Sequence, residues 1–206
     1  MGIRTSAATL TDALMLSVVN MRKRFSALEI SRLLLEGRIH EGDICIDATM
    51  GRGYDTLYLC GLVGSTGKVI AFDIQEDALN STKELLEEHG MTAELHQRSH
   101  EHMDEYADEG TVSCVMFNLG CLPRGDHNIH TDASSTITAI SKAMGLLKED
   151  GVICVIIYYG RETGYEEKEQ VLSFLRSIDS GRYSVVISEF ANRPNDPPIP
   201  CFIFRQ

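Results

Sequence analysis

A short segment in the first third of the chain combines an acidic residue and two glycines in a way that suits small-molecule binding. The segment DATMGRGYDT, residues 47–56, follows an apolar run at 44–46 that predicts a strand ending at Asp47. Gly51 and Gly53 let the backbone turn tightly and approach a ligand closely. The helical pattern that follows provides free N–H groups and the positive end of a helix dipole. The segment therefore predicts a ligand-binding loop.

A second acidic residue indicates what kind of ligand this loop holds. Asp73 ends the next predicted strand, in AFDIQ, twenty residues after Gly53. A carboxylate at this spacing accepts hydrogen bonds from a ribose. A dinucleotide motif would have glycine or alanine where this chain has Thr56, and AdoMet-binding loops often carry an acid such as Asp47 ahead of the glycines. We therefore favour S-adenosylmethionine (AdoMet) over NAD; a glycine turn with a capping Asp is the structural alternative.

The end of the fourth predicted strand carries the residues best suited to chemistry. The loop that follows Phe117-Asn118 is too long and too polar for a simple connection. AdoMet enzymes that act on nitrogen often have Asn or Asp at this place, where the amide oxygen can accept a hydrogen bond from an amine. Methyl transfer is an in-line displacement, so positioning the amine does much of the work. Asn118 is therefore a candidate catalytic residue.

The same loop offers candidate proton acceptors. An alkyl amine is mostly protonated at pH 7 and must lose a proton before it can attack. Asp126, His127 and Asp132 are within reach of the loop. A loop or helix-cap role is the alternative for each, and Asp132 before ASSTITAI suits a cap especially well.

Two residues after the third predicted strand are expected to border an adenine. These are Ser99 and His100, although a solvated loop histidine is the alternative. His100 and His102 could also be taken for a metal-binding pair. They stand two residues apart at a helix start, so they diverge, and no carboxylate or cysteine spacing completes a site. No metal is expected.

Strands and helices alternate along the chain, which favours a parallel sheet with helices on both faces. YSVVISEFA and PCFIFRQ, joined by RPNDPP, predict an antiparallel strand pair at the end. ALEISRLLLEGRI predicts a helix packed across the sheet. The expected strands lie near 43–48, 68–73, 93–97, 112–118 and 151–158, and the expected helices near 53–63, 76–89, 134–147 and 164–178.

Length and composition limit the class of protein. A chain of 206 residues suits one domain, here 1–206 with an N-terminal helical extension at 1–25. No apolar stretch approaches the roughly 18–20 residues of a membrane span. Six cysteines without a CxxC pair indicate reduced core thiols in a cytoplasmic protein. The net charge is −11, so the chain as a whole lacks the basic surface that is typical of a nucleic-acid binder.

Taken together, the motifs resemble those of the YtqB/MnmM family, once labelled rRNA methylases. The resemblance runs from about residue 27 to the end, in order. It implies a Rossmann-like class I methyltransferase fold with seven mostly parallel strands, AdoMet as cofactor, and a homodimer. It also implies methylation of the 5-aminomethyl group of 2-thiouridine at the tRNA wobble position, hence an anticodon loop as partner. The motifs are DATMGRGYDT, AFDIQ, FNLGCLPRGD, the helix start at 134–138, YYGRETGYEEKE and FANRPNDPP.

The residue pattern and the resemblance together predict the site. Asn118 and Asp126 are the expected catalytic residues. The first loop departs from the Gly-Asn-Gly-His that is common in the family, at Arg52 and Tyr54. The expected cofactor contacts are Asp47, Thr49, Gly51, Arg52, Gly53, Tyr54, Asp73, Gln75, Ser99, His100, Asn118 and Leu119.

Several alternatives stay open at this point. A small-molecule amine methyltransferase on the same fold would suit the acidic charge better, and an rRNA methyltransferase would share the fold. An NAD-linked oxidoreductase and a non-catalytic RNA-binding protein are two further classes. Arg124, Arg161 and Arg193 could form a local basic rim for RNA at the strand ends, with scattered surface arginines as the alternative.

Overall fold

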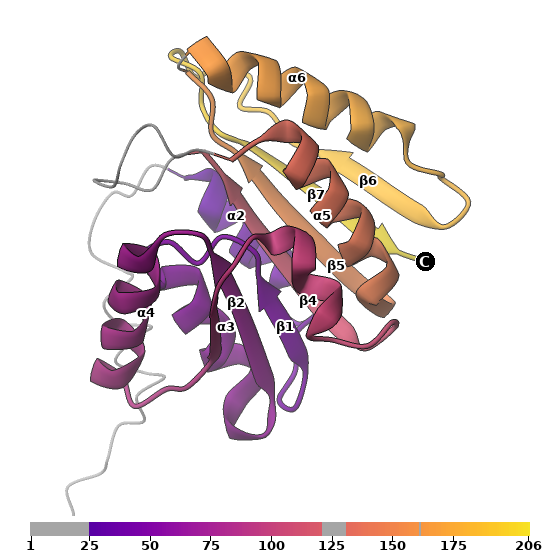
Figure 1. Ribbon diagram of the computed structural model, residues 1–206. Coiled ribbons are helices and arrows are strands. Elements are labelled where there is room, and N and C mark those ends of the chain that lie inside the picture. The colour runs from indigo at the N-terminus through magenta and orange to yellow at the C-terminus, as the bar shows by residue number, and fades with distance from the viewer. Residues whose placement is uncertain (1–24, 121–130, 161) are drawn as a thin grey trace, which may run out of the picture.

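The predicted parallel sheet forms the centre of the molecule. A computed structural model describes residues 25–120, 131–160 and 162–206 (Figure 1). The strands are β1 (Ile44–Asp47), β2 (Lys68–Asp73), β3 (Glu94–Gln97), β4 (Val112–Leu119), β5 (Leu147–Ile157), β6 (Tyr183–Ile187) and β7 (Ile199–Arg205). They lie in the order β3-β2-β1-β4-β5-β7-β6. Neighbours among β1 to β5 are parallel, whereas β7 is antiparallel to both β5 and β6.

Helices cover both faces of this sheet (Figure 1). Each face has its own hydrophobic core. One core contains side chains of α2 (Ala27–Leu35), α3 (Tyr54–Val63) and α4 (Glu76–Glu88). The other contains side chains of the 3₁₀ segment η2 (His100–Glu105), α5 (Ala133–Leu146) and α6 (Glu162–Ser177). A second 3₁₀ segment, η1 (Gly64–Thr66), follows α3 directly.

The central strands are apolar on both sides because both of their faces are covered. Along β4, Cys114 belongs to the core under α2 and α3, and its neighbour Val115 belongs to the opposite core. This alternation is what a strand requires, since successive side chains point to opposite faces. The strand expected near 151–158 forms the second half of β5, where every residue from Gly151 to Ile157 is buried. The described cysteines are buried free thiols.

The last two strands form the predicted antiparallel pair, but β6 ends earlier than expected, at Ile187. Its next residue, Ser188, still donates its backbone N–H to the carbonyl oxygen of Pro200 at 2.9 Å. Proline has no N–H with which to return that bond, so the ladder stops there. The segment 188–191, predicted as strand, therefore belongs to the connection between β6 and β7.

The described chain begins with a well-capped helix. The hydroxyl of Ser26 accepts a hydrogen bond from the Glu29 N–H at 3.2 Å, and the Glu29 carboxylate accepts one from the Ser26 N–H at 2.7 Å. This reciprocal pair fixes the start of α2. The predicted N-terminal extension falls almost wholly on residues 1–24, outside the described residues. Within the described ranges, no helix is long and apolar enough to cross a membrane.

The strand order places a ligand site at one edge of the sheet. From β1 the chain crosses to β2 on one side, and β4 lies on the other side of β1. In open α/β sheets, ligands bind beyond the carboxyl ends of the strands where the strand order reverses. The predicted loop after Asp47 and the residues around Asn118 both stand at this point.

Candidate active site

The loop after β1 is held from below by Asp47, which is fully buried. Its Oδ1 accepts a hydrogen bond from the backbone N–H of Thr49 at 3.1 Å, and its Oδ2 accepts one from the Thr56 hydroxyl at 2.6 Å. Burial, with a smaller effect of the Asp55 carboxylate, raises the pKa of Asp47 to about 7. Asp47 therefore shapes the loop from beneath and does not line the cavity above it.

The two glycines of the loop are required by its shape. Gly51 and Gly53 have positive φ angles of 51° and 82°. A Cβ at Gly53 would lie 2.9 Å from the Cα of Thr82 in α4, so glycine is needed where the loop passes this helix. The carbonyl oxygen of Gly51 accepts hydrogen bonds from the hydroxyls of Ser81 and Thr82, each at 3.3 Å. Contacts with α4 thus hold the loop, and Gly51, unlike Gly53, lines the cavity.

Asp73 stands at the carboxyl end of β2, beside the glycine loop. Its Oδ2 accepts a hydrogen bond from the Gly51 N–H at 3.1 Å, and its Oδ1 accepts one from the Gln75 N–H at 3.0 Å. Burial raises the pKa of this carboxyl, although the two N–H groups favour the ionised form. Asp73 also lines the cavity. A carboxylate has lone pairs to spare beyond two such bonds, so it can accept hydrogen bonds from the hydroxyls of a ribose.

Ser99 and His100 lie on the other side of the cavity, at the start of η2. The Ser99 hydroxyl caps η2. His100 Nδ1 lies 3.1 Å from the carbonyl oxygen of Ala48, so this nitrogen carries the ring proton. Burial lowers the pKa of His100, which keeps the ring neutral. Among the described residues no cluster of acidic, histidine or cysteine side chains could hold a metal ion, and this includes the segment around His102.

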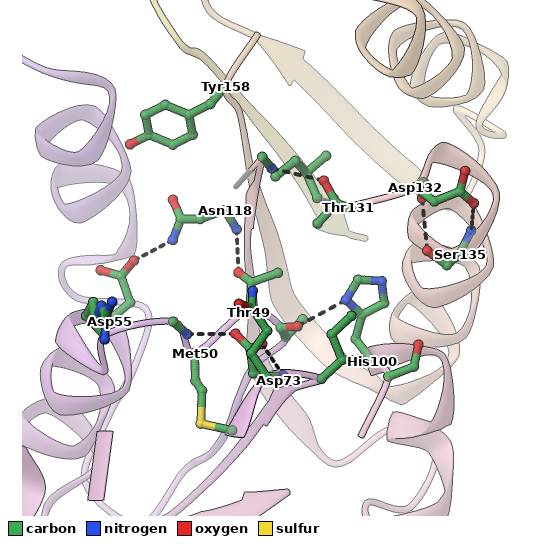
Figure 2. A pocket seen from close by; sticks show the side chains of 18 of the residues that line it. Thr49, Met50, Asp55, Asp73, His100, Asn118, Thr131, Asp132, Ser135 and Tyr158 are labelled. Carbon is green, nitrogen blue, oxygen red and sulfur yellow. Dashed lines mark hydrogen bonds between the residues drawn. The ribbon is translucent and has the colours of Figure 1, made fainter. Parts of the chain in front are cut away.

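Asn118, near the carboxyl end of β4, is held at two points (Figure 2). Its backbone N–H donates to Oγ1 of Thr49 at 2.7 Å, and its side-chain Nδ2 donates to Oδ2 of Asp55 at 2.5 Å. Burial raises the pKa of Asp55, while the Asn118 N–H and the charge of Arg32 oppose this effect. Sequence reasoning missed Asp55, because an acid in the first turn of a helix also suits the helix dipole. Its only signal was its place in the predicted ligand loop, two residues after Gly53.

The long loop after β4 returns to the cavity where α5 begins. The Gly120 N–H donates to the Thr131 hydroxyl at 2.9 Å, so the two ends of the loop meet. Asp132 is the N-cap of α5, and its Oδ2 accepts hydrogen bonds from the N–H groups of Ser134 and Ser135 at 3.0 and 3.2 Å. Asp132 therefore has the helix-cap role that was the alternative to its role as a proton acceptor. The predicted catalytic Asp126, like His127, lies outside the described residues.

A cavity of about 660 Å³ joins these elements. Asp73 and His100 lie toward one end, and Asp55, Asn118 and Tyr158 lie toward the other (Figure 2). Its size is that of a small-molecule cofactor site. The predicted cofactor contacts that line it are Thr49, Gly51, Arg52, Tyr54, Asp73, Gln75, Ser99, His100, Asn118 and Leu119.

The fold and the cavity define a class I AdoMet-dependent methyltransferase, as the sequence predicted. The chain belongs to the family described as "Putative rRNA methylase", whose profile matches residues 69–204.

Relatives with solved structures agree closely with this fold. A protein of Clostridium thermocellum described as a putative rRNA-methylase is 43% identical, with a TM-score of 0.86, over 89% of this chain and 100% of that one. A putative methyltransferase of Streptococcus mutans, solved in complex with SAH, is 34% identical, with a TM-score of 0.80, over 90% of this chain and 100% of that one. SAH is AdoMet without its transferable methyl group. The cofactor of this family is therefore AdoMet.

A plant relative has a more specific name. The chain is 35% identical over 194 residues to a chloroplastic tRNA (mnm(5)s(2)U34)-methyltransferase of Arabidopsis thaliana. The match covers 89% of this chain and 70% of the plant protein.

Proposed function

We propose that this enzyme transfers the methyl group of AdoMet to the primary amine of 5-aminomethyl-2-thiouridine at the wobble position of tRNA. The similarity to the plant enzyme, over 89% of the chain, supports this substrate. The structural observation that carries the proposal is the Asn118 amide in the cavity wall. Its Nδ2 donates a hydrogen bond to the carboxylate of Asp55. Its Oδ1 therefore points away from that carboxylate and can accept a hydrogen bond from an amine.

The residues that line the cavity match the ribose, adenine and methionine parts of AdoMet. In the proposal, Asp73 accepts hydrogen bonds from the ribose, and Ser99 and His100 border the adenine. The backbone of the glycine loop, together with Asn118 and Leu119, surrounds the methionine part. When bound, AdoMet supplies a methyl group activated by its sulfonium. Asp47 and Gly53 contribute indirectly, because one holds the loop from beneath and the other lets it pass α4.

The chain's own residues position the amine and allow its proton to leave. Asn118 Oδ1 accepts an N–H of the neutral amine and thereby turns the nitrogen lone pair toward the methyl group. Attack in line with the bond to sulfur then needs little further reorganisation. An alkyl amine carries a proton at pH 7, which solvent at the open cavity or a nearby carboxylate must accept. Asp126 stays the candidate carboxylate.

Two exposed aromatic residues at the cavity support a nucleotide substrate. Tyr54 is 67% exposed and Tyr158 is 45% exposed, and both line the cavity. Unpaired bases stack on such rings, and a wobble base already lies in an unpaired loop. Of the predicted basic rim, Arg124 and Arg161 lie outside the described residues. Arg193 donates to the carbonyl oxygen of Phe25 and stacks on Phe190.

The proposal extends to organisation and location. We propose one domain over residues 1–206, a homodimer, and a cytoplasmic location with an anticodon loop as partner. Deletion of residues 1–25 tests whether they contribute to the dimer. If they do, the particle mass measured by light scattering falls to that of one chain.

Methyl transfer itself gives the decisive test. The enzyme is incubated with labelled AdoMet and bulk tRNA that carries 5-aminomethyl-2-thiouridine, and the nucleosides are analysed by mass spectrometry. We expect this nucleoside to gain the mass of one methyl group. Asn118→Ala should reduce the rate strongly while AdoMet still binds. An unmodified nucleoside in the presence of bound AdoMet would refute the tRNA substrate.

One observation favours a second candidate, a small-molecule amine methyltransferase. The net charge of −11 repels RNA in general. This alternative predicts that the free 5-aminomethyl nucleoside or another small amine is methylated as fast as tRNA. Ribosomal RNA in the same assay tests the substrate that the family description names.

A further inference from the structure

We infer that Asp55 is a positioning residue that holds the Asn118 side-chain amide with its oxygen toward the substrate amine. This inference rests on the proposed function, because it explains how the amine acceptor of that reaction is oriented. Asp55 was not among the residues predicted from the sequence, and it lies 63 positions from Asn118 in the chain.

The contact between the two side chains determines which atom of the amide faces the cavity. Asn118 Nδ2 lies 2.5 Å from Asp55 Oδ2, a short distance for an N–H donor and a carboxylate. An ionised carboxylate only accepts hydrogen bonds, so it selects the NH₂ group of the amide and rejects the oxygen. Because the amide is planar, its oxygen must then point away from Asp55.

The backbone of Asn118 is fixed independently of this contact. Its N–H donates to the Thr49 hydroxyl at 2.7 Å, on the loop that precedes α3. The remaining freedom is rotation of the amide by half a turn. That rotation would present an NH₂ group to a substrate amine, which must itself donate an N–H. The carboxylate of Asp55 makes the productive orientation the favoured one.

The dipole of α3 alone does not account for Asp55. An acid in the first turn of α3 interacts favourably with the helix dipole, but that role does not require a contact with β4. Moreover, Asp55 Oδ1 is buried and has no hydrogen-bond partner among the described residues. A buried carboxylate oxygen without a partner destabilises the fold. A neutral residue at this position would avoid that penalty, which indicates that the charge serves the site.

A spectroscopic experiment tests the contact without any substrate. The protein is labelled with ¹⁵N-asparagine, and Asn118→Ala identifies the Asn118 side-chain resonance. We expect its NH₂ protons to be shifted and slow to exchange in the wild type, and to become ordinary in Asp55→Asn. The matched control is Asp77→Asn, the same change at the second residue of α4, where the side chain is exposed. An Asn118 resonance that is unaffected by Asp55→Asn would overturn the inference.

A double-mutant cycle tests whether Asp55 acts through Asn118. Asp55→Asn exchanges a charge-assisted hydrogen bond for a neutral one, so we expect kcat to fall about 10-fold. The AdoMet dissociation constant should not rise, and the melting temperature should not fall. The double variant with Asn118→Ala should be no slower than Asn118→Ala alone. Losses that multiply, or a lower melting temperature for Asp55→Asn, would indicate a structural role instead.

The two parts of the experiment separate this inference from the proposed function. Should the wild type leave tRNA unmethylated while the Asn118 resonance responds to Asp55→Asn, the tRNA substrate is wrong and the orienting contact stands. The double-mutant cycle is then carried out with whichever amine the enzyme does methylate. Should tRNA be methylated while the resonance does not respond, the proposed function stands and the role of Asp55 is wrong.

Discussion

Gly53→Ala and Gly61→Ala are expected to change the free energy of unfolding in opposite directions. Gly53 caps α3 at its start with a φ of 82°, and Gly61 lies inside the same helix. Alanine in the left-handed region costs about 1–2 kcal/mol. Its Cβ at position 53 would also lie 2.9 Å from the backbone Cα of Thr82, which cannot swing aside. Overpacking of this kind costs about 1–3 kcal/mol, so Gly53→Ala should lower the free energy of unfolding by about 2–5 kcal/mol.

A Cβ added at Gly61 would have no atom within 4 Å beyond its chain neighbours and the nearby backbone of α3. Alanine is preferred to glycine inside a helix by about 0.5–1 kcal/mol, so Gly61→Ala should stabilise the protein by about that amount. Urea unfolding followed by circular dichroism measures both changes. Calorimetry with SAH should show weaker binding for Gly53→Ala only, because the loop moves with Gly53. A Gly53→Ala variant as stable as Gly61→Ala would refute the reasoning from φ angle and close approach.

Four further variants test three carboxylates of the site. Asp47 has a pKa of about 7, so it takes up a proton more readily when folded, and its contribution to stability is present at low pH and lost as pH rises through 7. The stability of Asp47→Asn relative to the wild type should therefore rise between pH 5 and pH 8, by about 3 kcal/mol in urea titrations; parallel curves would contradict the pKa. Asp73→Asn should weaken SAH binding about 10-fold or more in calorimetry, since it loses a charged acceptor, whereas unchanged affinity would exclude a ribose contact. Asp132→Ala should lower the free energy of unfolding by about 1 kcal/mol through loss of the α5 cap, and Asp132→Asn should be close to neutral in the same titration.

Local signals in the sequence were enough for much of the architecture. Alternating apolar patterns and turn residues depend on near neighbours in the chain, so the order of strands and helices followed from them. The expected helix at 134–147 differs from α5 by one residue at each end. The glycine loop and Asp73 were predicted to lie at one site, because a glycine turn and the next strand end recur at a regular spacing in this architecture, and Gly51 and Asp73 do line one cavity.

Contacts between distant segments were beyond the reach of these signals. Asp47 was expected to contact the cofactor, but the packing of Thr56 over it leaves it buried beneath the loop. The early end of β6 depended on which residue of β7, Pro200, lies opposite Ser188.

The sequence by itself therefore determined the class of fold, the cofactor and the segments that form the site, since each of these depends on local pattern and spacing. Only the tertiary structure decided what each polar side chain does there. The pKa and the hydrogen-bond partners of a carboxylate depend on burial and on groups far away in the chain. Asp55 and Asn118 illustrate this, because α3 and β4 must first pack together before the two side chains can meet.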